Sequence, residues 1–264
     1  MNPYEFTKEQ VQHYERDGSL IVRQLFDLEE VGLLEAVGHA NRASRRLVMK
    51  DATGSESKLW LDTERKRDIY NAYVNNPRIV RPMEQLLGGP VYQWHYKMML
   101  KEPLVGGAWE WHQDYGYWYW DKCLFPRLAS CMVGVNKASR ENGCLQVLRG
   151  SHHLGRLQHG VTGGQTGADP ERVEAAAKCL ELVYAELAPG DALFFHCNLL
   201  HRSDQNRSEH PRWAFICCYN SMENIPYLGP GHGEPVAIVP WDDGDIKRVG
   251  TEQLAGLTAA PVQG

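Results

Sequence analysis

The sequence lacks the marks of a membrane, secreted or nucleic-acid-binding protein. No apolar run approaches the roughly 18–20 residues that a transmembrane helix needs. Residues 1–10 are polar and carry no apolar stretch of the kind found in secretory leaders, so we expect no signal peptide. Lysine and arginine form no dense run, and the formal net charge is −5, which is unfavourable for binding a polyanion. We therefore expect neither a membrane nor a nucleic acid as a partner.

Cysteine is present without the spacing that would give it a structural role. The seven cysteines are an odd number, no two have C-x-x-C spacing, and Cys217 and Cys218 are neighbours. This pattern fits neither a disulfide framework nor a zinc knuckle. It is typical of small, reduced side chains inside a protein, and it predicts a cytoplasmic location.

Length and apolar content allow one large globular unit. The chain has 264 residues, and its 43% hydrophobic content suffices for a sizeable β-barrel core without a second domain. We expect a single domain over residues 1–264, with a helical flank (1–89), a barrel core (90–220) and a C-terminal wrap (221–264). The sequence leaves open whether the protein is a monomer or a homodimer.

Two capping boxes organise the first part of the chain. Thr7 with Gln10, and Asp27 with Glu30, each place a capping side chain three residues before a glutamine or glutamate. The expected elements are helices over residues 8–16 and 28–43, with a strand over residues 19–23 between them. Residues 42–66 are charged and interrupted by glycine and serine, so they predict either a lid or a solvated loop. Short helical turns are expected from Asn76 to Gly89.

From residue 90 the pattern changes to short strands separated by turns. Asn142-Gly143 and Pro189-Gly190-Asp191 supply turn chemistry between them. The expected strands are 91–100, 108–112, 128–136, 144–148, 182–187, 192–196 and 212–220, with one inserted helix over 169–178. The tail after Tyr227 carries no periodic pattern. The fold class is therefore mostly β with flanking helices, arranged as a barrel or jelly roll.

The run from Trp109 to Tyr115 contains His112-Gln113-Asp114. In an extended strand, side chains at i and i+2 leave the same face, so this imidazole and this carboxylate can bind one cation. A second histidine would complete the two-histidine, one-carboxylate set of non-haem Fe(II) oxygenases. The triplet alone equally fits a surface histidine and aspartate beside a loop.

The second histidine is expected to be His201, which follows the turn at Pro189 and the apolar strand after it. Other histidines compete, including His152, His153 and His196, but their positions favour capping or core roles. Arg212 favours His201, because a hairpin between them would return its guanidinium to the metal side of the barrel. Ser203 shares the face of His201, and with Arg212 it would form a fork-shaped acceptor for a carboxylate.

These motifs, in this order and with these gaps, resemble the phytanoyl-CoA dioxygenase family of Fe(II)/2-oxoglutarate oxygenases. The resemblance runs from Gln10 to Asn220 and covers most of the chain. The pieces that carry it are His112-Gln113-Asp114, Ser139 to Leu145, Gly150-Ser151-His152, Pro189-Gly190-Asp191, His201 with Ser203, and Arg212. In place of the usual proline before Gly150, this chain has Arg149.

The resemblance implies a double-stranded β-helix, a jelly-roll or cupin-like barrel. It also implies that His112, Asp114 and His201 hold Fe(II), and that 2-oxoglutarate and O2 are cosubstrates. By family position, Arg212 and Ser203 would bind the distal carboxylate of 2-oxoglutarate, and Lys97 would line the 2-oxoglutarate or substrate pocket. The expected reaction is hydroxylation with release of succinate and CO2. A carboxylate at Asp114 favours hydroxylation over chlorination, because related halogenases have a small residue there.

The substrate is expected to be a small polar or zwitterionic metabolite, an amino-acid derivative or an aminophosphonate. The segment from Val91 to Lys101 and the aromatic run after Asp114 look closer to bacterial hydroxylases of proline and ectoine than to the fatty-acyl-CoA enzyme. Candidate substrate contacts are His95, Tyr115, Tyr117 and Trp118, since aromatic rings can hold an ammonium group. Lys101, Arg127 and Arg156 are further basic groups that can meet an acid.

Several alternatives remain open from the sequence. The same iron chemistry can act on an acyl-CoA or natural-product intermediate, or give desaturation, epimerisation or ring formation. The same three ligands can hold zinc for hydrolysis. A binding protein that has lost turnover is a third possibility, although the intact ligand set and Arg212 weigh against it.

Overall fold

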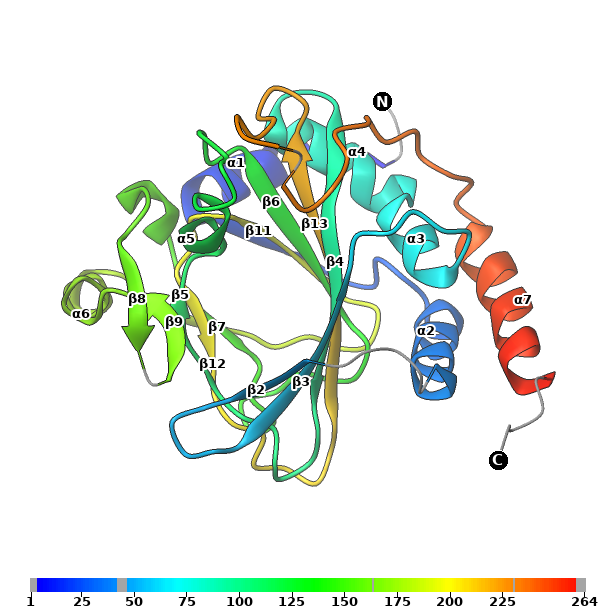
Figure 1. The fold of residues 1–264 in the computed structure, drawn as a ribbon, viewed down its shortest axis with the longest axis horizontal. Coiled ribbons are helices and arrows are strands. Elements are labelled where there is room, and N and C mark those ends of the chain that lie inside the picture. The colour runs from blue at the N-terminus through cyan, green and yellow to red at the C-terminus, as the bar shows by residue number, and fades with distance from the viewer. Residues whose placement is uncertain (1–3, 42–46, 163, 230, 260–264) are drawn as a thin grey trace.

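Two antiparallel sheets face each other across the core of the computed structural model, which describes residues 4–41, 47–162, 164–229 and 231–259 (Figure 1). The larger sheet has the order β1-β11-β6-β13-β4-β3-β2, and the smaller has the order β10-β7-β12-β5. The larger sheet comprises β1 (Ser19–Val22), β2 (Leu47–Lys50), β3 (Glu56–Asp62), β4 (Val91–Lys101), β6 (Leu128–Gly134), β11 (Ala192–His196) and β13 (Arg212–Ser221). The smaller comprises β5 (Trp109–His112), β7 (Leu145–Leu148), β10 (Leu182–Ala185) and β12 (His201–Ser203). This arrangement confirms the predicted fold class.

Most helices cover the outer face of the larger sheet, whereas α5, α6 and a two-stranded hairpin lie on the side of the smaller sheet (Figure 1). The helices are α1 (Lys8–Asp17), α2 (Leu28–Ala40), α3 (Ile69–Val74), α4 (Pro77–Leu87), α5 (Asp114–Trp118), α6 (Pro170–Cys179) and α7 (Asp245–Ala259), with one 3-10 turn η1 (Ser151–Leu154). The hairpin is β8 (His159–Thr162) with β9 (Gln165–Ala168). Both predicted capping boxes are present, at Thr7 and Asp27. No helix in the described ranges is long and apolar enough to cross a membrane.

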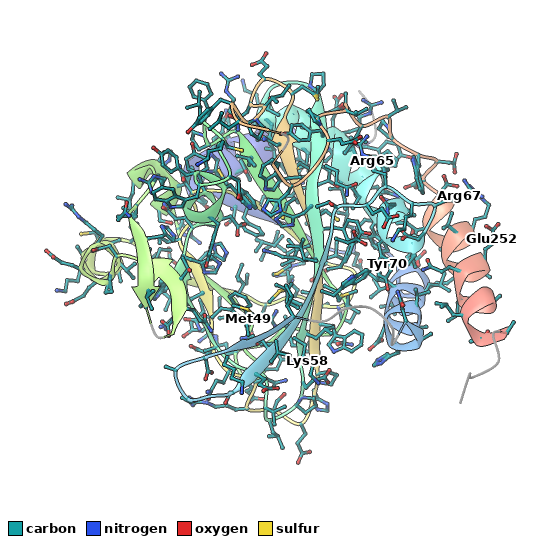
Figure 2. The ribbon with its side chains drawn as sticks, in the orientation of Figure 1. Met49, Lys58, Arg65, Arg67, Tyr70 and Glu252 are labelled. Atoms are coloured by element: carbon teal, nitrogen blue, oxygen red, sulfur yellow. The ribbon has the colours of Figure 1, made fainter. Side chains whose placement is uncertain are left out.

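Side-chain alternation along the central strands creates two separate cores. On β13, Phe215 and Cys217 pack outward against the helices, whereas Ile216 and Cys218 pack inward between the sheets. All ten residues of this strand are buried, as expected for a strand covered on both faces. Tyr70 of α3 stacks on the β4 ring of Tyr96, and Figure 2 shows it pointing from the helix toward the sheet.

A β-bulge in β4 decides which of its residues line the interior. Cys218 pairs with His95 but the next residue, Tyr219, pairs with Gln93, so one residue of β4 is skipped in the register. Consequently Trp94 and Met99 both belong to the inner core, although their positions differ in parity. After the bulge the odd-numbered residues face inward, which places His95 and Lys97 on the inner wall.

The expected lid or loop over residues 42–66 is wrong for residues 47–62, whereas residues 63–66 are irregular and residues 42–46 lie outside the described part. Residues 47–62 form the β2–β3 hairpin, and β3 extends the larger sheet by pairing with β4. Asp51 fixes the turn, because its carboxylate accepts hydrogen bonds from the backbone N–H groups of Thr53, Ser55 and Ala108 at 2.8–3.0 Å. β2 is the exposed edge strand at the end of the larger sheet.

Two further expectations differ from the structure. Residues 77–87 form one continuous helix with Pro82 inside it, because its buried apolar face against the sheet outweighs the missing hydrogen bond. The tail is not wholly irregular, since α7 packs Ile246 and Val249 into the outer core. The predicted helical flank over residues 1–89 also contains β1, β2 and β3 of the larger sheet.

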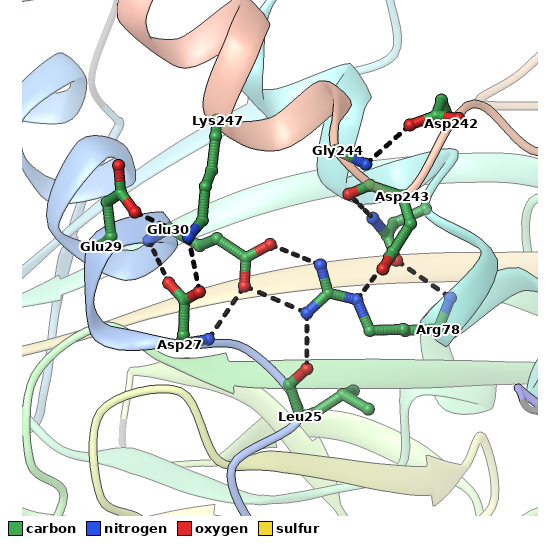
Figure 3. A network of polar contacts seen from close by, with 10 residues as sticks. Leu25, Asp27, Glu29, Glu30, Arg78, Asp242, Asp243, Gly244 and Lys247 are labelled. Atoms are coloured by element: carbon green, nitrogen blue, oxygen red, sulfur yellow. Dashed lines mark hydrogen bonds and ion pairs between the residues drawn. The ribbon is translucent and has the colours of Figure 1, made fainter.

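An ion-pair network ties α7 and the preceding loop to the N-terminal helices (Figure 3). Arg78 of α4 pairs with Glu30 of α2 and, at 2.6 Å, with Asp243. Lys247 of α7 lies 2.7 Å from Asp27 and 2.6 Å from Glu29 at the start of α2. These contacts hold the first turn of α7 and the loop before it against α2 and α4.

Candidate functional site

His112 and His201 lie directly opposite each other on neighbouring strands. His112 is the last residue of β5, His201 is the first of β12, and the two are register partners in the antiparallel pair. Their ring centroids are 4.1 Å apart, and both side chains are buried. The structure therefore brings together the two histidines that the sequence singled out.

Asp114 joins this pair by a route that differs from the predicted one. The strand ends at His112, Gln113 stays extended, and Asp114 is the first residue of the short helix α5. Its Oδ1 atom lies 3.9 Å from Nε2 of His201. One ligand atom from each of these three buried residues lies within 4.8 Å of the others, and no other such group of three is found among the described residues.

The two imidazoles are oriented for metal binding by backbone carbonyls. Nδ1 of His112 lies 2.7 Å from the carbonyl oxygen of Glu110, and Nδ1 of His201 lies 2.9 Å from that of Leu199. A carbonyl oxygen only accepts, so each Nδ1 carries the proton and donates it, which leaves the Nε2 lone pair free. Burial lowers the pKa of both histidines, and that of His112 falls well below its usual value, so both stay neutral as ligands must.

The carboxylate of Asp114 is held ionised by its neighbours. Burial raises its pKa, but the nearby charge of Lys97 opposes this effect, and the pKa lies below the usual value. Nζ of Lys97 lies 3.9 Å from Oδ1, and the Ser130 hydroxyl donates to Oδ2 at 3.2 Å. Two neutral imidazoles and one carboxylate on a buried patch fit a divalent transition-metal ion such as Fe(II).

Gln113, between the two predicted ligands, is a positioning residue that sequence reasoning missed. Its side chain is fully buried, donates to the carbonyls of Gly155 (2.7 Å) and Asn198 (2.8 Å), and accepts from the Leu157 N–H (2.7 Å). Its own backbone N–H donates to Nε2 of His159 at 3.0 Å. These partners come from loops outside β5, so no local pattern in the sequence announces them.

Arg212 is a buried cation without a carboxylate partner among the described residues. Its Nη2 donates to the carbonyl of Gly143 at 2.7 Å, while its Nε has no hydrogen-bond partner. Burial lowers its pKa to about 10. An unpaired buried guanidinium is costly unless an anion joins it, so this residue fits the carboxylate of a bound ligand.

The predicted hairpin between His201 and Arg212 is wrong. β12 lies in the smaller sheet beside β5 and β7, whereas β13 lies in the larger sheet beside β4 and β6. Ser203 is buried, and its strand partner is Leu145. Cys144, the residue before Leu145, is a neighbour of Arg212. The two residues thus approach one end of the barrel from opposite sheets.

The side chain of Lys101 is hydrogen-bonded within the protein, so it is not free to bind an acidic group as the sequence suggested. It is fully buried opposite Arg212, and its Nζ donates to the backbone carbonyls of Ser203, at 3.4 Å, and Asp204. Burial, and then the charge of Arg212, lowers its pKa well below the usual value. Lys101 therefore fixes the loop after β12 and adds positive potential beside Arg212.

The four candidate substrate contacts, His95, Tyr115, Tyr117 and Trp118, do not form a single cluster. The rings of His95 and Trp118 lie 5.7 Å apart, and both residues are buried. Tyr117 lies 5.7 Å from the His112 ring, although its hydroxyl donates to the Thr166 carbonyl. Tyr115 is buried, and its hydroxyl donates to the Cys123 carbonyl at 3.0 Å. His95 and Trp118 form one group, whereas both tyrosine hydroxyls already have partners within the protein.

The other basic and imidazole groups named from the sequence lie elsewhere. Arg127 pairs with Glu223, and Arg156 stacks over the ring of Tyr119 at 4.2 Å. The remaining histidines considered as ligands, His152, His153 and His196, form a separate ring cluster with centroids 3.9 and 5.3 Å apart.

Comparisons with known proteins agree with this geometry. A family model described as phytanoyl-CoA dioxygenase (PhyH) matches residues 14–214. An L-proline trans-4-hydroxylase from Streptomyces griseoviridis is 28% identical over 230 residues, which cover 81% of this chain and 86% of the relative. An ectoine dioxygenase from Bordetella parapertussis is 28% identical over 243 residues, covering 82% and 76%. The crystal structure of EctD from S. alaskensis with bound Fe has the same fold, with a TM-score of 0.76, 23% identity and coverage of 91% and 89%.

Proposed function

Since the chain belongs to the phytanoyl-CoA dioxygenase family, we propose that it hydroxylates an unactivated C–H bond of a small zwitterionic metabolite. The protein is a 2-oxoglutarate-dependent dioxygenase that uses Fe(II) and O2. The substrate is an amino-acid derivative or a compound of similar size and charge, such as an aminophosphonate. The relatives named for proline and ectoine, both small zwitterions, support this class.

One observation carries the proposal: two imidazoles and one carboxylate converge within 4.8 Å while a buried, unpaired guanidinium stands at one end of the same barrel. Bound Fe(II) with 2-oxoglutarate supplies the oxidising chemistry, in which O2 gives one oxygen atom to succinate and one to the hydroxylated product, with loss of CO2. His112, Asp114 and His201 would hold the ion. The protein's part is to orient the reacting groups and to exclude water.

Arg212 and Ser203 would bind the distal carboxylate of 2-oxoglutarate. The guanidinium has a free Nε donor, and a carboxylate can accept from two of its N–H groups at once. Lys101 adds a second positive charge from the facing strand while its ammonium stays bound to carbonyls. This end of the barrel therefore favours a dianion over a neutral molecule.

Lys97 would stand between the ion and the substrate. It lies on the inner wall of β4, 3.9 Å from Asp114, and its side chain is only 19% exposed. It can neutralise Asp114 and still offer a donor to an acid. His95 and Trp118, further along the same wall, would contact the substrate, with Tyr117 beside His112 and Tyr115 behind it.

We further propose that residues 1–264 act as one cytoplasmic domain. The seven cysteines are free, six of them are buried, and none forms a disulfide, which suits a reducing compartment. The C-terminal helix packs on α2 and α3, and the network of Arg78 and Lys247 ties its first turn and the preceding loop to α2 and α4 (Figure 3). The N-terminal and C-terminal parts thus share one hydrophobic core.

The test is a screen for substrate-dependent succinate release. The purified protein with Fe(II), ascorbate and 2-oxoglutarate is offered L-proline, ectoine, 2-aminoethylphosphonate and pooled polar metabolites. At least one small zwitterion should raise succinate release and gain one oxygen atom from O2. Hydrolysis of a metabolite with zinc alone, independent of 2-oxoglutarate and O2, would instead establish the hydrolase alternative.

A further inference from the structure

The segment after β13 crosses the mouth of the barrel before it reaches α7 (Figure 1). We call residues 231–241 the strap. Its backbone is hydrogen-bonded to the start of β4 and to the end of α3: Ile238 N–H donates to the Val91 carbonyl and Trp241 N–H to the Asn75 carbonyl, each at 2.9 Å. Arg65, labelled in Figure 2, donates to the carbonyls of Glu234 (3.1 Å) and Val236 (2.9 Å). The strap is therefore a fixed part of the mouth.

Two glycines let the strap press against β4. Gly231 has φ +67°, a conformation that favours glycine, and a Cβ there would overlap the indole of Trp94. A Cβ at Gly233 would overlap the carbonyl oxygen of Gln93. Side chains at either position would force the strap away from the strand, so the close approach depends on both.

This approach brings His232 into a closed group of four rings. The cycle runs from Trp94 to Trp118, His95, His232 and back to Trp94, with ring centroids 5.2–6.4 Å apart and ring planes at 69–77° between successive members. Trp94, His95 and Trp118 are buried, whereas His232 is 35% exposed. His232 is therefore the outward member of this four-ring group.

The position of His232 is fixed by Asp121 from the loop after α5. Its Nε2 lies 3.1 Å from Oδ2 of this carboxylate. On its outer side it lines a surface hollow of about 320 Å³ together with Thr63, Glu64, Arg65, Gly233 and Glu234. On its inner side it contacts His95. His232 thus separates an open hollow from the buried wall that leads through Lys97 to Asp114.

The buried side of the four-ring group has unmet hydrogen-bonding capacity. Nε1 of Trp94 and Nδ1 of His95 are buried and have no hydrogen-bond partner within the part of the chain that the structure describes. Buried polar atoms are usually paired, so two in one cluster indicate a site for a polar ligand. The perpendicular rings offer both edges and faces, which suits a small molecule that carries charged and apolar parts.

We propose that His232, held by Asp121, is a specificity-determining residue that closes the substrate pocket on its outer side. The inference rests on the proposed function and adds two points to it. The substrate enters from the hollow beside the strap, and the four-ring group forms the wall that selects small zwitterions. Removing the imidazole would open the wall toward the hollow and release the ring of His95. Binding of the zwitterion should weaken, while 2-oxoglutarate, bound at the Arg212 end, should be unaffected.

The experiment compares His232→Ala, His232→Asn, Asp121→Asn and the exposed-site control His210→Ala with the wild type. Whichever of L-proline and ectoine releases more succinate from the wild type serves as the probe. The KM values for this probe and for 2-oxoglutarate, the melting temperature and the succinate-to-product ratio are measured for each variant. Direct probe binding is measured without O2 by titration calorimetry.

We expect His232→Ala to raise the KM and Kd for the probe about tenfold, or about 1.4 kcal/mol, because the substitution opens the wall and releases the ring of His95. Its KM for 2-oxoglutarate and its melting temperature should be unchanged, and succinate should be formed in excess of product. Asp121→Asn should give a smaller effect, His232→Asn should recover part of the binding, and His210→Ala should resemble the wild type.

Three other results would contradict the inference about His232 or the proposed substrate class. An unchanged KM for the probe in His232→Ala overturns the inference and leaves the proposed function intact. A lower melting temperature, or equal rises in both KM values, assigns His232 a structural role and also overturns it. If neither zwitterion stimulates the wild type or binds to it, the proposed substrate class fails, and the inference that rests on it fails too.

Discussion

Arg212 lies directly opposite Lys101 across the β13–β4 pair, so two buried cations share one end of the barrel. Lys101 meets backbone carbonyls, whereas Arg212 keeps a donor atom without a partner. Like charges buried side by side oppose folding unless an anion relieves them. This pair is therefore a site prepared for a carboxylate, and it gives the first prediction.

Arg212→Ala should raise the KM for 2-oxoglutarate by roughly 10- to 100-fold, because a charge-assisted hydrogen bond contributes about 1.5–3 kcal/mol. Succinate formation is measured against 2-oxoglutarate concentration. Arg127→Ala, which removes an arginine paired with Glu223 on the surface, is the matched control and should leave the KM unchanged. An unaltered KM in Arg212→Ala would place the cosubstrate elsewhere.

His112→Ala or His201→Ala should abolish tight Fe(II) binding and succinate formation. Each removes one of three ligands, and the remaining pair leaves an incomplete coordination set. Binding is measured by anaerobic calorimetry, so the result does not depend on turnover. His153→Ala, an exposed histidine of the separate ring cluster, is the control; normal succinate yield from either ligand variant would refute the assignment.

Gln113→Leu should destabilise the protein and weaken Fe(II) binding. The change leaves the Leu157 N–H and the carbonyls of Gly155 and Asn198 unpaired, and each buried unpaired group costs about 1–3 kcal/mol. Fe(II) affinity should fall roughly 10- to 100-fold, as for other residues that orient ligands. Urea unfolding and anaerobic calorimetry measure the two effects. Wild-type values for both would show that Gln113 does not position its neighbours.

His196→Asn should flatten the pH dependence of stability below neutrality. Burial, followed by His152 and His153, lowers the pKa of His196 to about 4, so the unfolded chain binds a proton that the folded protein rejects. The contribution of His196 to the free energy of unfolding is complete above the pKa of this residue in the unfolded chain, about 6.5. It falls as the pH drops from about 6.5 toward 4, and at pH 5 it is lower by about 2 kcal/mol.

Asparagine suits this test because its Oδ1 can accept the Asn198 N–H as Nδ1 of His196 does at 3.0 Å. The free energy of unfolding is measured by urea titration at pH 7 and pH 5. The difference between these two values should shrink in His196→Asn by about 2 kcal/mol. His153→Asn serves as the exposed control, and an equal reduction there would assign the effect to surface charge.

The sequence was most informative where the chemistry lies in short motifs. The strand predicted over residues 108–112 contains β5, and His112, Asp114 and His201 come together in the structure, although β12 itself was not predicted. The two capping boxes likewise predicted α1 and α2 from local side chains alone. Local hydrogen bonding and alternation are encoded within a few residues, so a single sequence reveals them.

Features that depend on distant contacts could not be predicted. β2 and β3 contain charged residues, and only the pairing of β3 with β4 makes them part of the sheet. Gln113 and Lys101 are fixed by loops more than 40 residues away in the chain. The strap brings His232 beside His95 through glycine contacts with no motif of their own.

The bulge in β4 also makes this wall sensitive to chain length. If Trp94 were deleted, the two parts of β4 would pair regularly with β13 and keep their partners and faces, with His95 opposite Cys218 and Gln93 opposite Tyr219, and the wall would lose only the indole. If the bulge were lost without a deletion, Trp94 would pair with Tyr219 instead, so Trp94 and Tyr92 would turn outward toward the helices and Gln93 inward toward the barrel. Either change would alter the mouth of the pocket and spare Lys97, which makes this position a natural point for relatives of the enzyme to diverge in substrate choice.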